Sequence, residues 1–352
     1  MSWRHCSRFV GTIIATAAAL LVLVTALPHD KYLRYKALID QQAPTADWIY
    51  ERIHFDPAPI DIAFIGTSRT GLSIQSRRLE QKLAEGGLDA KAANLHIVRT
   101  GNNMHYAVAK ELLENRRVGL LVLEITESEE RRPHPAFMYL ADTEDIVLAP
   151  LIINLRYFDD LIRLPGRQID LFGRSMLAKI ASPDGLFDIT RYKGSNLDHG
   201  ESITTEDGVV RDRNQSHSVE HMENLLKDQL ARDTPPAYKR IPFLQDRLRE
   251  LEYRFPRLMM NRIIDLARSK ETGVVLVYLP RYGGPDEPPA YREVFSSKVD
   301  LINAKPALND ARYWWDVPHV NAEGSRRVTD LVAEAILQRG YLARSTYAKG
   351  HQ

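Results

Sequence analysis

Apolar and polar residues alternate in blocks along most of this chain, and the blocks have the lengths of strands and helices. Mainly apolar, strand-like runs at residues 60–65, 94–98, 118–125 and 273–280 have the length and composition of buried strands. A fifth, shorter strand is predicted at residues 312–315. Segments with helical spacing separate these runs, and such alternation is typical of a parallel sheet with crossover helices.

Helical periodicity predicts the connecting elements of this α/β fold. Amphipathic patterns occur at residues 74–85, 106–115 and 321–338. A further helix is predicted over residues 244–267, with a break at Pro256 because proline interrupts helix interiors. Residues 281–311 are predicted to form a long polar loop.

The alternation is interrupted between about residues 128 and 240. This segment contains many prolines, glycines and charged residues, and its clearest helical patches are residues 151–164 and 219–231. An insertion of this size in an α/β domain is more often a lid or a substrate-binding addition than a second core. We therefore predict one α/β domain over residues 58–345 that includes the insertion.

Residues 9–27 form an uncharged apolar run that follows Arg4 and Arg8. At about 20 residues, the run is long enough to cross a bilayer as a helix. A cleaved signal peptide is the alternative, but the run exceeds the usual apolar region of roughly 7 to 15 residues. We favour a retained anchor at residues 1–28, with the following domain on the periplasmic side of the inner membrane, although basic residues after the run weaken the orientation signal.

A juxtamembrane segment, residues 29–57, connects this anchor to the predicted domain. Its aromatic side chains are candidates either for resting at the membrane interface or for packing on the domain; they are Tyr32, Tyr35, Trp48 and Tyr50. The sequence leaves these two alternatives open.

Composition excludes several classes of function. The 352 residues are 44% hydrophobic and carry a formal net charge of +1, so no overall field favours nucleic acid. The single cysteine, Cys6, precedes the apolar run, which leaves the exported part without a thiol and suits an oxidising compartment. Five scattered histidines show no zinc-ligand spacing, so we expect no metal and no cofactor; they are His54, His96, His105, His134 and His199.

Three side chains at the two ends of the predicted domain have the chemistry of an acyl-transfer site. Ser68 follows the first strand, and Asp316 and His319 lie on one loop before the last helix. A serine is a good nucleophile when a base takes its proton and a third group orients that base. We predict that Ser68 attacks an ester carbonyl, that His319 moves the proton and that Asp316 orients His319. The alternatives are a helix N-cap at Ser68 and a core histidine at His319.

These segments carry a resemblance to a known family. Gly66-Thr67-Ser68 after the first strand, Gly101 after the second, and Asp316-Val317-Pro318-His319 before the last helix resemble the SGNH (GDSL-like) hydrolase superfamily. The resemblance covers most of residues 60–337 outside the insertion. It implies a three-layer α/β/α sandwich with a mostly parallel sheet of about five strands, similar to flavodoxin, and a Ser68–His319–Asp316 triad.

The family pattern also implies an oxyanion hole, and here the chain departs from it. The implied donors are the backbone N–H groups of Ser68 and Gly101 and an asparagine after the third strand. This chain has Glu124-Ile125-Thr126-Glu127-Ser128 at that place. We predict that Asn102 or Asn103 supplies the missing donor; the alternative is a hole of two donors helped by Thr126 or Ser128.

Two further residues are candidates for binding substrate. Arg69, beside the nucleophile, has the chemistry to bind a carboxylate or a sugar hydroxyl, although a surface arginine is an equal alternative. Trp315 has the chemistry to line the site or stack on a sugar. We expect at least one of the pair Trp314 and Trp315 to be buried in the core.

An anchor followed by an SGNH-like domain without the family asparagine resembles the exported branch of the superfamily, which moves acyl groups on cell-envelope polysaccharides. The resemblance implies a carbohydrate or acyl-ester substrate and pairing with a membrane-bound acyltransferase. The sequence therefore predicts an anchored serine O-acyltransferase or esterase, with acetyl the first candidate for the acyl group. A non-catalytic binding component of a polysaccharide assembly complex is the alternative, and a secreted small-ester hydrolase is a third hypothesis.

Overall fold

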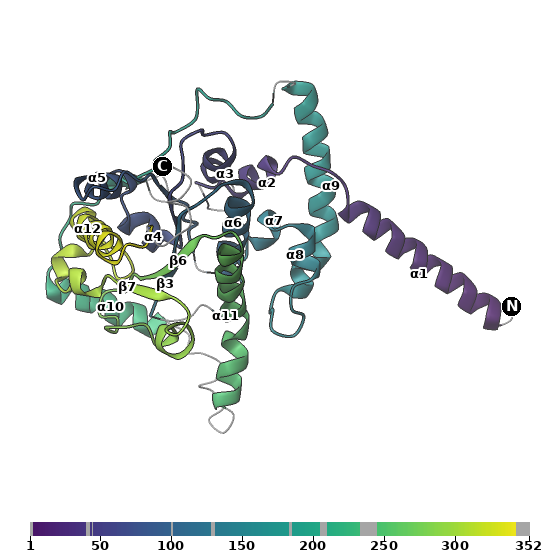
Figure 1. Ribbon diagram of the computed structural model, residues 1–352. Coiled ribbons are helices and arrows are strands. Elements are labelled where there is room, and N and C mark those ends of the chain that lie inside the picture. The colour runs from purple at the N-terminus through teal and green to yellow at the C-terminus, as the bar shows by residue number, and fades with distance from the viewer. Residues whose placement is uncertain are drawn as a thin grey trace.

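The computed structural model describes residues 3–39, 43, 45–99, 101–127, 131–182, 185–204, 210–232 and 245–342 of this chain. A sheet of five parallel strands forms its centre, in the order β2-β1-β3-β6-β7 (Figure 1). The strands are β1 (Ile62–Ile65), β2 (Ala92–Asn94), β3 (Leu120–Ile125), β6 (Gly273–Tyr278) and β7 (Asp300–Asn303). The predicted α/β class with a five-stranded parallel sheet is confirmed.

Neither edge strand is where the sequence predicted it. At one edge, β2 covers Ala92–Asn94 and shares only Asn94 with the strand predicted at residues 94–98. Residues 312–315 form no strand of this sheet: a 3-10 turn at Ala311–Tyr313 precedes a single bridge between Trp314 and Val320. The fifth strand is instead β7, inside the segment predicted to be a polar loop. Of its four residues only Ile302 is buried, so β7 lacks the continuous apolar run of a central strand.

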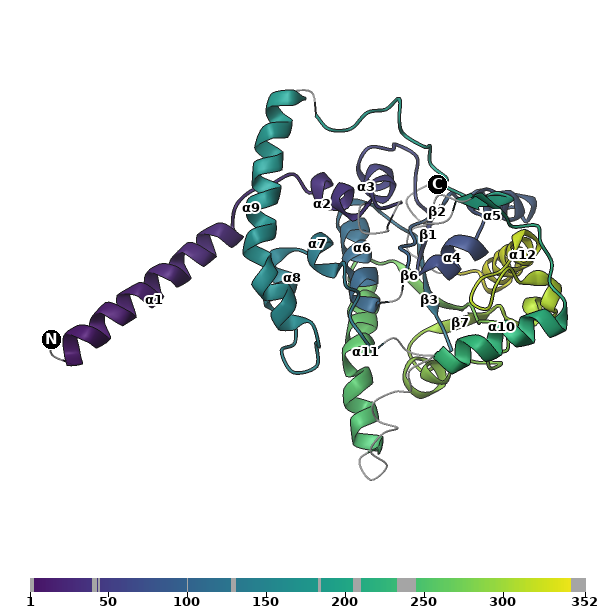
Figure 2. The ribbon, with the colours of Figure 1, turned by 180° about the vertical axis from the view of Figure 1, so that it is seen from behind.

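Helices cover both faces of the sheet (Figure 2). On one face α6 (Asn102–Asn115) and α11 (Gln245–Ser269) pack against alternate strand residues such as Leu121 and Leu123. On the other face α5 (Ser76–Glu85) and α12 (Ala322–Arg339) pack against Leu120 and Val122. Successive side chains of a strand point to opposite faces, so burial of both faces explains the continuous apolar runs.

The predicted break at Pro256 is wrong, because α11 runs through this proline without interruption. An interior proline costs a helix about 3 kcal/mol. Here Phe255, Met259 and Ile263 are all buried, and α11 packs along α6, so tertiary contacts offset that cost. The amide of Asn102 also donates a hydrogen bond to the carbonyl of Pro256 (3.1 Å).

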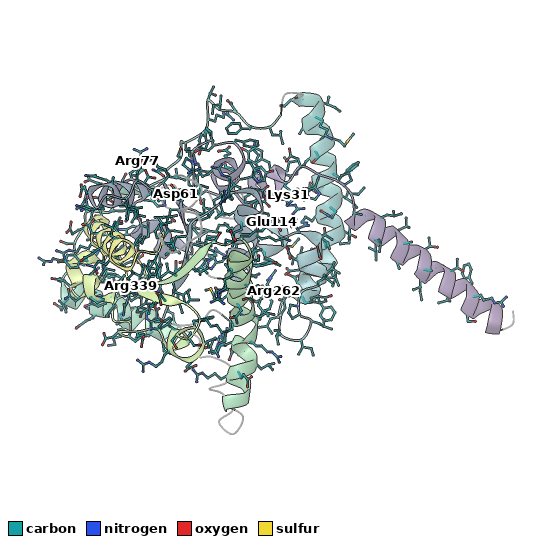
Figure 3. The ribbon with its side chains drawn as sticks, in the orientation of Figure 1. Lys31, Asp61, Arg77, Glu114, Arg262 and Arg339 are labelled. Atoms are coloured by element: carbon teal, nitrogen blue, oxygen red, sulfur yellow. The ribbon has the colours of Figure 1, made fainter. Side chains whose placement is uncertain are left out.

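The N-terminal segment contains α1 (Trp3–Thr25), α2 (Tyr32–Ile39) and α3 (Ala46–His54). Residues 7–25 are long and apolar enough to cross a membrane, a test that a signal sequence also passes. α1 projects away from the rest of the molecule, and its apolar side chains are exposed (Figure 3). In contrast, Tyr35 and Trp48 are buried in the core cluster, so the juxtamembrane aromatic residues pack on the domain.

The insertion forms a helical layer and a small hairpin. Its helices are α7 (Phe137–Leu140), α8 (Thr143–Val147), α9 (Tyr157–Ala181) and α10 (Val219–Arg232), and its hairpin is β4 (Ser202–Thr204) with β5 (Val210–Asp212). α9 starts later and extends further than the helical patch predicted at residues 151–164. The remaining short elements are α4 (Ser68–Ser73), a π-helical turn η3 (Tyr291–Phe295), and 3-10 turns η4 (Lys305–Leu308) and η5 (Ala311–Tyr313).

Candidate active site

A tight turn after β1 positions Ser68. Thr67 is the N-cap of α4, because its side chain accepts a hydrogen bond from the backbone N–H of Arg69 (3.1 Å). The alternative interpretation of Ser68 as an N-cap is therefore wrong, and its hydroxyl has no capping bond to make. Gly66 must be glycine, since a Cβ there would lie 2.1 Å from Thr70 Oγ1.

The structure brings Ser68, His319 and Asp316 into one hydrogen-bonded chain. Ser68 Oγ lies 2.8 Å from His319 Nε2, although 251 positions separate the two residues. His319 Nδ1 lies 3.0 Å from both carboxylate oxygens of Asp316. Asp316 favours the tautomer with the proton on Nδ1, which leaves Nε2 to accept the serine proton. The His319 side chain is 20% exposed, so the site is open to solvent.

The loop that carries Asp316 and His319 is fixed at both ends. Trp314 is buried and bridges to Val320, and the backbone N–H of Trp315 donates to the carbonyl of His319 (3.0 Å). Asn321 caps α12 by accepting from the N–H of Gly324 (2.9 Å). The expectation that one tryptophan of the pair is buried is confirmed; Trp315 is half-buried, with its ring centroid 6.3 Å from that of His319.

The buried carboxylate of Glu124, in β3, holds the nucleophile turn. It accepts hydrogen bonds from the backbone N–H groups of Thr67 (2.8 Å) and Thr70 (3.1 Å) and from both of their hydroxyls. Four donors satisfy a carboxylate that would otherwise be costly to bury. Sequence reasoning noted Glu124 only as part of a departure from the family pattern. A single acidic residue inside the apolar run of β3 was the available signal.

Arg69 is engaged within the protein. Its guanidinium makes two hydrogen bonds to the carboxylate of Glu127 (2.7 and 3.0 Å) and one to the carbonyl of Leu279 (3.1 Å). Burial opposes ionisation of Glu127, but the hydrogen bond and charge of Arg69 outweigh it and lower the pKa of this carboxyl. The predicted role of Arg69 in binding substrate stays a prediction; its observed contacts hold the segment after β3 beside Ser68.

Gly101 is the N-cap of α6 and has a φ of +152°, which favours glycine. A Cβ at this position would lie 2.5 Å from the Cβ of His134 and 2.8 Å from its backbone nitrogen. Within the described part of the chain, the backbone N–H groups of Ser68 and Gly101 make no hydrogen bond. Neither predicted backbone donor is therefore engaged by another residue of the described chain.

The side chains of Asn102 and Asn103 have other partners. The amide of Asn102 donates to the carbonyl of Pro256, as described above. Asn103 is buried, and its Oδ1 accepts from the backbone N–H of His134 (2.8 Å); its Nδ2 is buried and has no partner among the described residues. The third oxyanion donor stays a prediction, and one alternative for it, Ser128, lies outside the described residues.

Part of the insertion reaches the site, which sequence reasoning did not identify at the level of residues. His217 Nε2 lies 3.0 Å from the carbonyl oxygen of Trp315, in the triad loop. Arg213 is fully buried and donates to the carbonyl of Leu72 in α4 (2.8 Å). The insertion therefore contacts both the helix that starts at Ser68 and the loop that ends at His319.

The buried histidine His96 packs against α4, and the half-buried His199 lies beside it. A Cβ on Gly71 would come within 2.5 Å of the His96 ring, and the His96 and His199 rings are 5.5 Å apart. Burial, helped by His199, lowers the pKa of His96 to about 3. Burial, helped by Arg213, lowers the pKa of His199 to about 4. Both rings are therefore neutral in the fold at pH 7.

Acidification is expected to destabilise the protein through these histidines. In the unfolded chain these two imidazoles bind protons near pH 6.5, whereas in the folded chain they bind protons only near pH 3 to 4. Their contribution to the free energy of unfolding is therefore complete above pH 6.5 and is lost as the pH falls toward 4. Between pH 7 and pH 4.5, His96 alone is expected to remove roughly 2 kcal/mol from the free energy of unfolding. Denaturant titrations of wild type and His96→Gln at both pH values measure this; an equal pH dependence in the two proteins would contradict it.

Comparisons with known proteins do not assign this chain to a family. No family model matches this chain, and no curated protein matches its sequence. The functional conclusion therefore depends on the arrangement of Ser68, His319 and Asp316 and on the resemblance read from the sequence.

Proposed function

We propose that this protein is an exported serine O-acyltransferase or esterase that forms an acyl-enzyme on Ser68. The observation that carries the proposal is the chain of hydrogen bonds from Ser68 Oγ to His319 and from His319 to Asp316. Nucleophile, base and orienting carboxylate lie within bonding distance, and such a constellation defines this chemistry independently of fold.

The reaction follows from the positions of these atoms. Ser68 Oγ attacks the ester carbonyl while its proton passes to Nε2 of His319, and the negative charge that develops on the carbonyl oxygen requires donors. The free N–H groups of Ser68 and Gly101 are the proposed donors, and each such donor contributes about 3 to 4 kcal/mol. Collapse of the intermediate releases the alcohol, which takes the proton from His319. An acceptor hydroxyl or water then repeats the steps in reverse and regenerates Ser68.

The fold is proposed to be an SGNH-type α/β/α sandwich. The strand order β2-β1-β3-β6-β7, with helices on both faces, supports this assignment. Ser68 follows the carboxyl end of β1, which pairs with β3, and ligands of open parallel sheets bind at that edge. Glu124 and Glu127 take the place of the family asparagine and hold the turn and the neighbouring segment.

The proposed substrate is an acyl, first of all acetyl, ester of a cell-envelope polysaccharide, with α1 as a retained anchor in the inner membrane. The length and apolar character of α1 support anchoring, and export to the periplasmic side follows from its place before the domain. A membrane-bound acyltransferase as partner is implied by the resemblance alone.

A non-catalytic binding component remains the second candidate. The observation in its favour is the absence of the family asparagine, since neither Asn102 nor Asn103 has an exposed and unengaged amide. If the protein only binds its ligand, Ser68 is not reactive although the three residues are arranged as a triad. The reactivity of Ser68 can be measured directly.

Covalent labelling by a fluorophosphonate probe tests the proposal. Full-length wild-type protein in detergent is expected to be labelled, and Ser68→Ala is expected to show no labelling, because the probe requires an activated serine. Ser76→Ala is the matched control: the hydroxyl of Ser76 is buried without a partner among the described residues, so labelling should persist. An unlabelled wild type, or labelling that survives in Ser68→Ala, contradicts the nucleophile assignment.

Transfer and hydrolysis are then distinguished by their products. Wild-type protein that has not been treated with the probe is incubated with an acyl ester donor, in the presence and absence of an oligosaccharide acceptor. Acylated sugar is detected by mass spectrometry. Acylated sugar that depends on Ser68 supports transfer, and free acid alone supports an esterase.

A further inference from the structure

The outer face of α9 is apolar although it is exposed. Side chains between 47 and 77% exposed lie along it, namely Phe158, Ile162, Ile169, Met176, Leu177 and Ile180. Five of them follow one another at spacings of four or seven residues, which places them on a single narrow face of this 25-residue helix. An extended apolar face of this kind marks an interaction surface.

The inner face of α9, toward the protein, is largely polar. Asp160, Arg167, Gln168 and Ser175 are all buried there, and Arg167 donates to the carbonyl of Ala141 (2.8 Å). A surface helix of a soluble protein has the opposite polarity, with apolar residues inside and polar residues outside. The orientation of α9 is therefore that of a helix whose outer surroundings are apolar.

The apolar surface continues into the loop between α8 and α9. Four further exposed side chains belong to it: Leu148, Leu151, Ile152 and Leu155, of which Ile152 is 84% exposed. We call these four residues, together with the six on α9, the α9 patch. Charged residues border the patch on one flank of the helix, where Arg163 pairs with Asp159 and Arg174 pairs with Asp170.

The helix that carries the patch, α9, lies next to the end of α1. The amide of Gln168, in the middle of α9, donates to the carbonyl of Thr25, the last residue of α1 (2.7 Å). The hydroxyl of Ser175 accepts from the backbone N–H of Asp30, just after α1 (2.8 Å). In both views α9 lies at the outside of the molecule, between α1 and the sheet (Figures 1 and 2).

From this continuity we infer that the α9 patch lies in the interface of a lipid bilayer. A chain that leaves the membrane at Thr25 places α9 at the membrane surface, and an amphipathic helix there buries its apolar face at the boundary of headgroups and acyl chains. The ion-paired arginines beside the patch then lie among the headgroups. α4, which begins at Ser68, lies on the other side of the sheet from α9 (Figure 2). The inference does not depend on acyl transfer.

Depth measurements on the full-length protein in phospholipid nanodiscs test this inference. Cys6 is replaced by serine, and single nitroxide labels are placed at Ile152, Ile162 and Ile169 through cysteine substitutions. We expect each label to collide more with oxygen, which concentrates in the acyl region, than with a water-soluble nickel chelate. Labels at Arg163 and Arg174 on the flank are the matched controls and should show the reverse ratio.

A label at Leu21 tests separately whether α1 crosses the bilayer, so that this question is kept apart from whether the α9 patch contacts lipid. If Leu21 has the collision ratio of the bilayer interior and the three patch labels behave like the arginine controls, the inference is overturned. Immobilised patch labels that collide with neither reagent, or dipolar broadening between copies, would show a protein occupant and also overturn it. The six labelled positions are exposed, and circular dichroism of each labelled protein verifies the fold.

Discussion

Replacing His319 with alanine is expected to lower kcat for acyl-ester turnover by at least about 10⁴-fold. The imidazole is the only base within hydrogen-bond distance of Ser68 Oγ in the described part of the chain, at 2.8 Å. Without it the hydroxyl stays protonated and is a weak nucleophile. The measurement is steady-state hydrolysis of a chromogenic acyl ester by the full-length protein in detergent.

Two further variants sharpen this result. His221→Ala removes an exposed histidine that stacks on His217, and it should keep near wild-type turnover. Asp316→Asn keeps the shape of the loop but loses the charge that orients and stabilises the protonated imidazole, so a loss of about 10³ to 10⁴ is expected. Equal turnover in wild type and His319→Ala would show that this arrangement performs no acyl transfer.

The second large effect concerns stability. Glu124→Ala is expected to lower the free energy of unfolding by about 3 to 5 kcal/mol, because it leaves the N–H groups and hydroxyls of Thr67 and Thr70 without their acceptor and opens a cavity. Denaturant unfolding followed by tryptophan fluorescence measures this difference. Labelling of Ser68 by the fluorophosphonate probe should fall as well, since the same bonds fix the turn that carries the nucleophile.

Glu114→Ala is the matched control for this prediction. Glu114 is exposed on α6 and is labelled in Figure 3. Its removal should change the unfolding free energy by no more than about 0.5 kcal/mol, as is usual for surface substitutions. If Glu124→Ala unfolds like Glu114→Ala, then Glu124 does not hold the turn.

The three inner strands of the sheet were predictable because they are buried on both faces. Residues 60–65, 118–125 and 273–280 contain β1, β3 and β6, and each is a nearly continuous apolar run. β7 was missed because an edge strand with one buried residue carries no such run. The break at Pro256 was predicted from a local preference that the packing of α11 against α6 overrides.

The three residues of the candidate triad were predictable, whereas the hydrogen bonds that hold the segments carrying them were not. Residue type and position after a strand or before a helix were enough to name Ser68, Asp316 and His319. The bonds of Glu124 to Thr67, of Arg69 to Glu127 and of His217 to the triad loop join residues that are 57, 58 and 98 positions apart. No local pattern encodes such pairs, because each depends on how the chain returns to the same edge of the sheet.

The sequence by itself determined the α/β class, the N-terminal apolar helix and the three residue types of the candidate site, since apolar periodicity and run length report burial directly. Only the tertiary structure decided which groups contact the site residues and which faces of the helices are exposed. It placed Ser68 Oγ at bonding distance from His319, directed the amide of Asn102 to Pro256 and turned the apolar face of α9 outward. These features depend on contacts between elements distant in the chain, and such contacts are set by the packing of the whole fold.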